Sequence, residues 1–193
     1  MRKFTLLAIL AIFTLTAAIA QRKAVQLSPA FTDKELLNNS DFVLLPGLDE
    51  TYLRGEEAKL PKDGDFREIG RSVPANLTME NSGTWFDLAD GRKVWILRVK
   101  TPGAIATTAE IFDFFIPAGA QFFISDPAGT TRYGAYTVSD NAEFFGSDIV
   151  KGDEIVFEYV QPASVKAKAH MTIRDIFHLY RDVEFVTNTR DFG

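Results

Sequence analysis

The chain has 193 residues, of which 46% are hydrophobic, carries a formal net charge of −5 and contains no cysteine. This length suits one domain with a sizeable core, and without disulfides its stability must come from buried apolar surface. Lysine and arginine do not cluster and the balance is mildly acidic, so we expect no nucleic acid among its partners.

Residues 1–20 have the three parts of a secretory signal peptide. A basic start precedes an apolar run that ends near Leu15, and small residues then lead to Ala20. We expect cleavage between Ala20 and Gln21, and export through the general secretory route to a secreted or periplasmic location. The alternative is a membrane anchor, but the apolar run is shorter than the ~20 residues that span a bilayer. We therefore expect no stable membrane insertion after cleavage.

Residues 21–79 form a polar, charge-rich N-terminal arm. Thr32 and Glu35 have the spacing of a capping box just before Leu36, which predicts one short helix. Proline and glycine punctuate the rest of the arm. We expect it to be loosely structured, with one extended stretch at 66–73 that pairs onto the following domain.

Residues 80–183 are rich in β-prone runs separated by turn sequences. Asp90-Gly91 is typical of a tight hairpin turn. The expected strands are 84–88, 93–100, 105–115, 121–125, 132–137, 154–161 and 166–180, the last of them bent. Short strands with such turns predict an all-β fold, an antiparallel β-sandwich or jelly roll.

The residue types of a catalytic centre do not come together in the sequence. The only histidines are His170 and His178, and their even separation in the last expected strand would place both on one face. Neither lies in a known triad motif, so we interpret both as ordinary strand histidines. We expect this chain not to be an enzyme, because no nucleophile and base are paired.

One predicted loop is rich in carboxylates, which are ligands that calcium prefers. The weak calcium candidates are Asp140, Glu143, Asp148 and Asp153. Their spacing matches no calcium-loop pattern, so a solvated acidic loop is the favoured interpretation. Zinc-ligand spacing and glycine-rich phosphate loops are absent, and we expect no cofactor.

Aromatic residues could form either a core or a binding surface. Trp85 and Trp95 lie across the expected hairpin and could pair, and core packing is favoured over a sugar-binding platform. Three phenylalanine pairs stand at 114–115, 122–123 and 144–145. Adjacent strand residues point to opposite faces, so one member of each pair should point outward. Such a patch would contact another protein or the chain's own arm.

Several sequence strings follow one another in a specific order. They are ENSGTW at 80–85, GRKVWILRV at 91–99, TPGA at 101–104, FIPAGA at 115–120, GAYT at 134–137, KGDEIVFEY at 151–159 and IRDIFHLYR at 173–181. In this order they resemble the N-terminal prodomain of secreted bacterial trypsin-like serine proteases of the lysyl endopeptidase group. The resemblance covers most of residues 66–182.

The resemblance implies a β-sandwich prodomain that precedes a chymotrypsin-fold protease cleaving after lysine. The full-length relatives are serine endopeptidases, and residues 184–193 would be a tail leading to a protease domain that this sequence does not contain. The implied partner is a trypsin-like protease domain, in cis or in trans, which the prodomain would help to fold and would inhibit. Arg190 is a processing candidate, and no catalytic residue carries over.

Two questions stay open at the level of sequence. The chain could be the pre-pro segment of a longer product, the product of a truncated gene, or a relative that stands alone. Its function could also belong to another class, a secreted jelly-roll module that binds carbohydrate or a cell-surface partner through exposed aromatic residues and the acidic loop.

Overall fold

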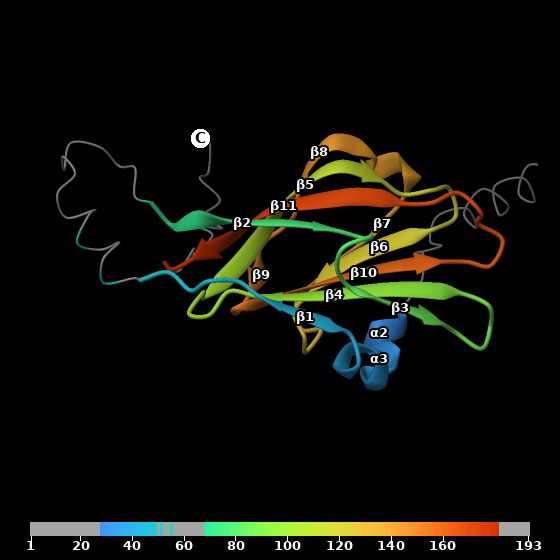
Figure 1. Cartoon of the computed structure of the whole chain (residues 1–193), viewed down its shortest axis with the longest axis horizontal. Coiled ribbons are helices and arrows are strands. Elements are labelled where there is room, and N and C mark those ends of the chain that lie inside the picture. Colours follow the sequence, from blue (N-terminus) through green and yellow to red (C-terminus); the bar gives the residue numbers. More distant parts are fainter. Residues whose placement is uncertain (1–27, 50, 52–54, 56–67, 182–193) are drawn as a thin grey trace, which may run out of the picture.

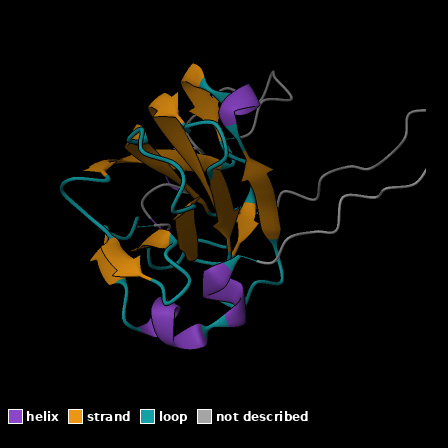
Figure 2. Ribbon diagram, turned by 90° about the vertical axis from the view of Figure 1, so that its right-hand side faces the viewer, coloured by secondary structure: helices purple, strands orange, loops and turns teal. Residues whose placement is uncertain are grey.

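The computed structural model describes residues 28–49, 51, 55 and 68–181. Two β-sheets lie face to face, and two short helices lie outside one of them (Figures 1 and 2). The all-β sandwich predicted from the sequence is therefore confirmed. The signal peptide with its cleavage site, and the tail with Arg190, lie outside the described residues. No helix in the described ranges is long and apolar enough to cross a membrane.

The six-stranded sheet has the order β1-β4-β10-β6-β7, with β3 also pairing with β4. The five-stranded sheet has the order β2-β11-β5-β8, with β9 also pairing with β5. All pairs are antiparallel except β1 with β4. The elements are α2 (Pro29–Thr32), α3 (Lys34–Asn38), β1 (Asp41–Leu44), β2 (Gly70–Thr78), β3 (Thr84–Asp87), β4 (Lys93–Lys100), β5 (Ala106–Phe115), β6 (Gln121–Ser125), β7 (Arg132–Tyr136), the 3₁₀ helix η1 (Val138–Asp140), β8 (Ala142–Gly146), β9 (Val150–Lys151), β10 (Glu154–Gln161) and β11 (His170–Leu179).

Strand β4 is apolar on both faces, and the packing of the sandwich explains why. Trp95, Leu97 and Val99 point into the core between the two sheets. Val94 and Ile96 point the other way, into a second apolar cluster that includes residues of the two helices. A strand that is covered on both sides reads as a continuous apolar run rather than as an alternating one.

The described part of the arm is built into both sheets. β1 lies parallel to the second half of β4, from Leu97 to Lys100. β2 pairs with β11, so the extended stretch expected at 66–73 is observed at 70–78, with residues 66 and 67 outside the described ranges. The sequence does not predict β1, because a four-residue strand paired with a distant partner has little local signature.

The predicted capping box is wrong in detail. Two single-turn helices replace the one expected helix, and the N-cap of the second is Asp33, whose carboxylate accepts the N–H of Glu35 at 3.0 Å. Thr32 belongs to the first helix, and its hydroxyl donates to the carbonyl oxygens of Ser28 and Pro29. Adjacent Thr and Asp are both good caps, and here the aspartate takes that position.

The turn before β3 closes around the indole of Trp95. The Nε1–H of Trp95 donates to the carbonyl oxygen of Ser82 at 2.9 Å. Gly83 has a φ of +76°, and a Cβ at this position would lie 2.3 Å from the Trp95 Nε1. Only glycine fits here, because both the backbone conformation and the space exclude a side chain.

Substitution of Gly83 by alanine tests this packing. We expect Gly83→Ala to lower the free energy of unfolding by about 3 kcal/mol, because it adds overpacking against Trp95 to the cost of a positive φ. Gly152→Ala is the matched control, since Gly152 has a φ of +97° with nothing within 4 Å of the added Cβ. Its cost should be about 1 kcal/mol. If denaturant unfolding shows the same loss of unfolding free energy in both variants, the clash with Trp95 is contradicted.

Candidate functional site

The two histidines lie far apart. His170 begins β11, is exposed and stacks on Phe115 with 4.9 Å between ring centroids. His178 lies near the end of the same strand, fully buried, with its Nδ1 2.9 Å from the Thr101 hydroxyl oxygen. Eight strand residues span about 26 Å. The two imidazoles therefore cannot act together, and each has its own local role.

The threonines near His178 differ in their hydrogen bonding. Thr101, in the turn after β4, makes the contact to the imidazole. Thr107 is paired with His178 across the β5–β11 ladder, and its buried hydroxyl has no hydrogen-bond partner in the described part of the chain. The Thr101 hydroxyl therefore hydrogen-bonds to His178, whereas the Thr107 hydroxyl has no partner among the described residues.

The acidic residues proposed as calcium ligands make separate local contacts. Asp140 accepts the backbone N–H of Thr137, and Asp148 accepts the hydroxyl of Tyr136 at 3.2 Å. Asp153 forms an ion pair with Lys100, and Glu143 is exposed on β8. No three metal-ligating side chains come together among the described residues. The weak calcium candidates therefore stay untested, and a solvated acidic loop stays the favoured interpretation.

The two tryptophans face each other across the β3–β4 hairpin. Their backbones are direct partners, which confirms the predicted pairing. Trp95 is fully buried in the core, as expected. Trp85 is 44% exposed and meets Tyr159 edge to face, so it belongs to the surface as much as to the core.

The three phenylalanine pairs each have one inward member. The inward rings are Phe114, Phe122 and Phe145, and they belong to or pack against the main core. The outward rings have three different environments. Phe115 stacks on His170, Phe123 is buried in the second apolar cluster, and Phe144 is 52% exposed. The outward phenylalanines therefore do not form a single patch.

Residues 28–40, which we call the strap, cover the outer face of the six-stranded sheet. The strap contains α2 and α3, and it contributes Ala30 and Leu37 to the second apolar cluster. The sheet contributes the other members of the cluster, Val94, Ile96, Phe123, Val156 and Val160. Of the outward phenylalanines, Phe123 therefore packs with the chain's own arm, which is one of the two predicted alternatives, whereas, within the described ranges, Phe115 and Phe144 do not.

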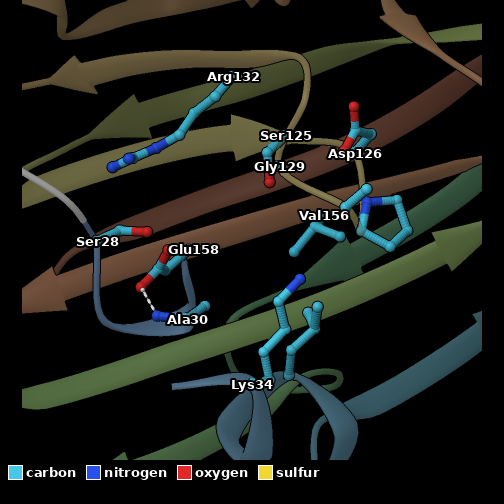
Figure 3. A pocket seen from close by; sticks show the side chains of 12 residues that line it. Ser28, Ala30, Lys34, Ser125, Asp126, Gly129, Arg132, Val156 and Glu158 are labelled. Carbon is cyan, nitrogen blue, oxygen red and sulfur yellow. Dashed lines mark hydrogen bonds between the residues drawn. The ribbon is translucent and has the colours of Figure 1, made fainter. Parts of the chain in front are cut away.

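Glu158 is an acidic residue buried beneath the strap. It lies between Val156 and Val160 on the outer face of β10 and is only 4% exposed. Its Oε1 accepts the backbone N–H of Ala30 at 2.8 Å, which ties the first turn of α2 to the sheet (Figure 3). Burial raises the pKa of the Glu158 carboxyl above its usual value, and the hydrogen bonds from Ala30 and Ser28 only partly offset this.

Several charged groups lie near Glu158. Arg132 and Arg92 act on it through charge, and the Arg132 guanidinium lies 4.5 Å from the Phe123 ring centroid. Lys34 and Asp126 line the same small cavity of about 20 Å³ (Figure 3). That volume holds about one water molecule.

A larger cavity of about 240 Å³ lies at one end of the five-stranded sheet. Its lining includes the carboxylates of Glu80 and Asp113 and the side chains of Met79 and Met171. Both methionines are buried, whereas both carboxylates are exposed. Chemically, this surface could contact a chain segment with both apolar and basic groups.

The outer face of the five-stranded sheet combines aromatic rings with charges. Phe144 meets Phe112 edge to face, and the Arg174 guanidinium lies 4.0 Å from the Phe112 centroid. Arg174 also forms ion pairs with Glu110 and Asp175. The result is a half-exposed ring beside fixed hydrogen-bonding groups.

The sequence analysis did not identify Glu158 as a site residue. The available signal was a carboxylate in a run that is otherwise apolar on both faces, a pattern that indicates a buried charge. Comparison with known protein families and with solved structures finds no match to this chain. The function must therefore be argued from the residues themselves.

A pair of threonine substitutions tests the role of the buried His178. We expect Thr101→Val to lower the free energy of unfolding by about 1 kcal/mol, because it removes the hydroxyl bonded to the imidazole. Thr107→Val is the matched control and should be neutral or slightly stabilising, since its hydroxyl makes no such bond among the described residues. Urea unfolding of both variants measures this, and the reverse order would refute the assignment.

Proposed function

We propose that this chain is a secreted prodomain that assists the folding of a trypsin-like, lysyl endopeptidase-like serine protease and inhibits it. The mechanism is binding rather than catalysis. The observation that carries the proposal is the ordered set of strings that resembles such prodomains, because these strings extend along the whole sandwich rather than along one motif.

The positions of these strings support that interpretation. The first string contains Gly83 and the second contains Trp95, which pack against each other. The third contains Thr101 and the last contains His178, which share a hydrogen bond. The matching residues are therefore those that hold the turns and strands of the sandwich together, so the resemblance concerns a complete domain.

The position of the last strand also fits a prodomain. β11 lies between β2 and β5 in its sheet, and Tyr180 after it is buried. A segment attached to a central strand is firmly tethered to the domain. A protease attached in this way would fold next to its inhibitor at high effective concentration.

Addition in trans tests the proposal. Residues 21–193 are mixed with the protease domain of a lysyl endopeptidase of this group, once as folded enzyme and once during refolding from denaturant. We expect inhibition that saturates at one prodomain per protease, and a higher yield of active enzyme on refolding. A trypsin-like protease from outside the group is the control and should be inhibited less. The proposal is excluded if the prodomain neither inhibits the protease nor raises the yield of active enzyme.

The second candidate is a module that binds carbohydrate. The observation that favours it is the exposed Phe144 ring, which meets Phe112 edge to face, since Phe112 also carries the Arg174 guanidinium and a ring near hydrogen-bonding groups suits a sugar. This surface is independent of the strap, because it lies on the other sheet.

A glycan array, with and without calcium, tests this second candidate. We expect any bound glycan to lose about tenfold in affinity in the Phe144→Ala variant, equivalent to ~1.4 kcal/mol. Val138→Ala is the control, because Val138 is an exposed apolar residue outside the β8 strand. Binding that persists unchanged in Phe144→Ala would exclude this surface.

A further inference from the structure

The strap is tied to the sheet differently at its two ends. At its C-terminal end it continues directly into β1, and the N–H of Asp41 donates to the Thr84 hydroxyl at 2.8 Å. At its N-terminal end, the Glu158 carboxyl receives the hydrogen bond from Ala30. The α3 end is therefore held by the β1–β4 ladder, whereas the α2 end is held by the packing of Ala30 on the apolar cluster and by its hydrogen bond to the buried Glu158.

Ionisation of the Glu158 carboxyl changes how strongly it holds the α2 end of the strap on the sheet. A buried carboxyl accepts a backbone N–H in either protonation state, but a buried carboxylate has also lost its hydration. When the strap lifts, water solvates the carboxylate, so the ionised form favours the open arrangement more than the neutral form does.

We infer that residues 28–40 act as a pH-responsive strap, which protonation of Glu158 holds on the six-stranded sheet and ionisation of Glu158 loosens at its α2 end. Loosening exposes part of the apolar face that includes Val156 and Phe123. It also frees Lys34, the first residue of α3, which lines the cavity around Glu158. This inference does not depend on the proposed prodomain function.

Charged groups from several elements surround Glu158. Arg132 on β7 and Arg92 before β4 act on it through their positive charge, and Lys34 on α3 lines the same cavity. Burial pushes the pKa of Asp126 upward, but hydrogen bonds from Thr130 and Thr131 outweigh this and leave it below 3.8. Asp126 therefore stays charged above that pH.

The direction of the pH effect follows from the raised pKa of Glu158. The folded protein binds the proton more tightly than the unfolded chain, whose glutamate titrates near 4.5. The stabilisation of the closed strap is complete below pH 4.5 and is lost as the pH rises through the higher pKa of the closed state. The strap should therefore be tightest in mild acid and looser at neutral pH.

Hydrogen exchange of the full secreted chain between pH 4.5 and 7.5 tests the inference. The readouts are the protection factors of the Ala30 and Asp33 amides, which donate to Glu158 and to Pro29, corrected for intrinsic exchange. We expect both to fall several-fold as the pH rises, while the Asn39 amide in the α3 cap changes less. Protection of Ala30 and Asp33 that does not depend on pH would overturn the inference.

Two variants separate Glu158 from its surroundings. Glu158→Gln keeps the shape and an oxygen acceptor but cannot ionise, so its protection factors should not change with pH. Glu154→Gln is the matched control on the same face of β10, where Glu154 pairs with Arg98 at 2.7 Å outside the strap. It should keep the pH dependence of the unmodified chain. The inference is wrong if Glu158→Gln retains that dependence.

A titration of the unmodified chain avoids any concern that a variant misfolds. The carbon-13 signal of the Glu158 carboxyl reports its ionisation directly. We expect its midpoint to lie above 4.5 and to coincide with the midpoint of the loss of Ala30 protection. A Glu158 midpoint at or below 4.5, or two midpoints that differ, would refute the link between ionisation and strap opening.

Discussion

The fold depends on covering both faces of the six-stranded sheet. β4 and β10 are apolar on their inner and outer faces, and no cysteine is present to stabilise the chain in another way. The inner face is buried by the second sheet, and within the described ranges the strap covers the outer face. The arm is therefore part of the domain physically, because without it a row of valine, isoleucine and phenylalanine side chains would face water.

This constraint also explains where the polar groups of the interior lie. Glu158 and His178 are buried on opposite sheets, and each has a partner from a segment distant in the sequence, Ala30 and Thr101. Buried polar groups cost free energy unless they are hydrogen-bonded, so each one also selects a particular arrangement of the chain. Glu158 differs in that its charge state can change, which makes its contact adjustable.

The resemblance to protease prodomains and the packing of the sandwich concern the same residues. Gly83 packs against Trp95, and Thr101 hydrogen-bonds to His178. A resemblance at these positions therefore concerns the packing of the domain. The exposed Phe144 lies outside the matching strings, whereas Arg174 on the same face lies within the last of them. The matching strings therefore concern mainly the packing of the domain, and the proposed function rests on an experiment with a protease.

The sequence by itself determined the all-β class, most of the strands of the body, the Trp85–Trp95 pairing and the outward position of one phenylalanine in each pair. These features depend on alternation and turn chemistry, which are local. The tertiary structure alone reveals that β1 joins the six-stranded sheet and that Glu158 lies beneath the strap. Those features depend on contacts such as Ala30 with Glu158, 128 positions apart, for which neither segment has a local signal.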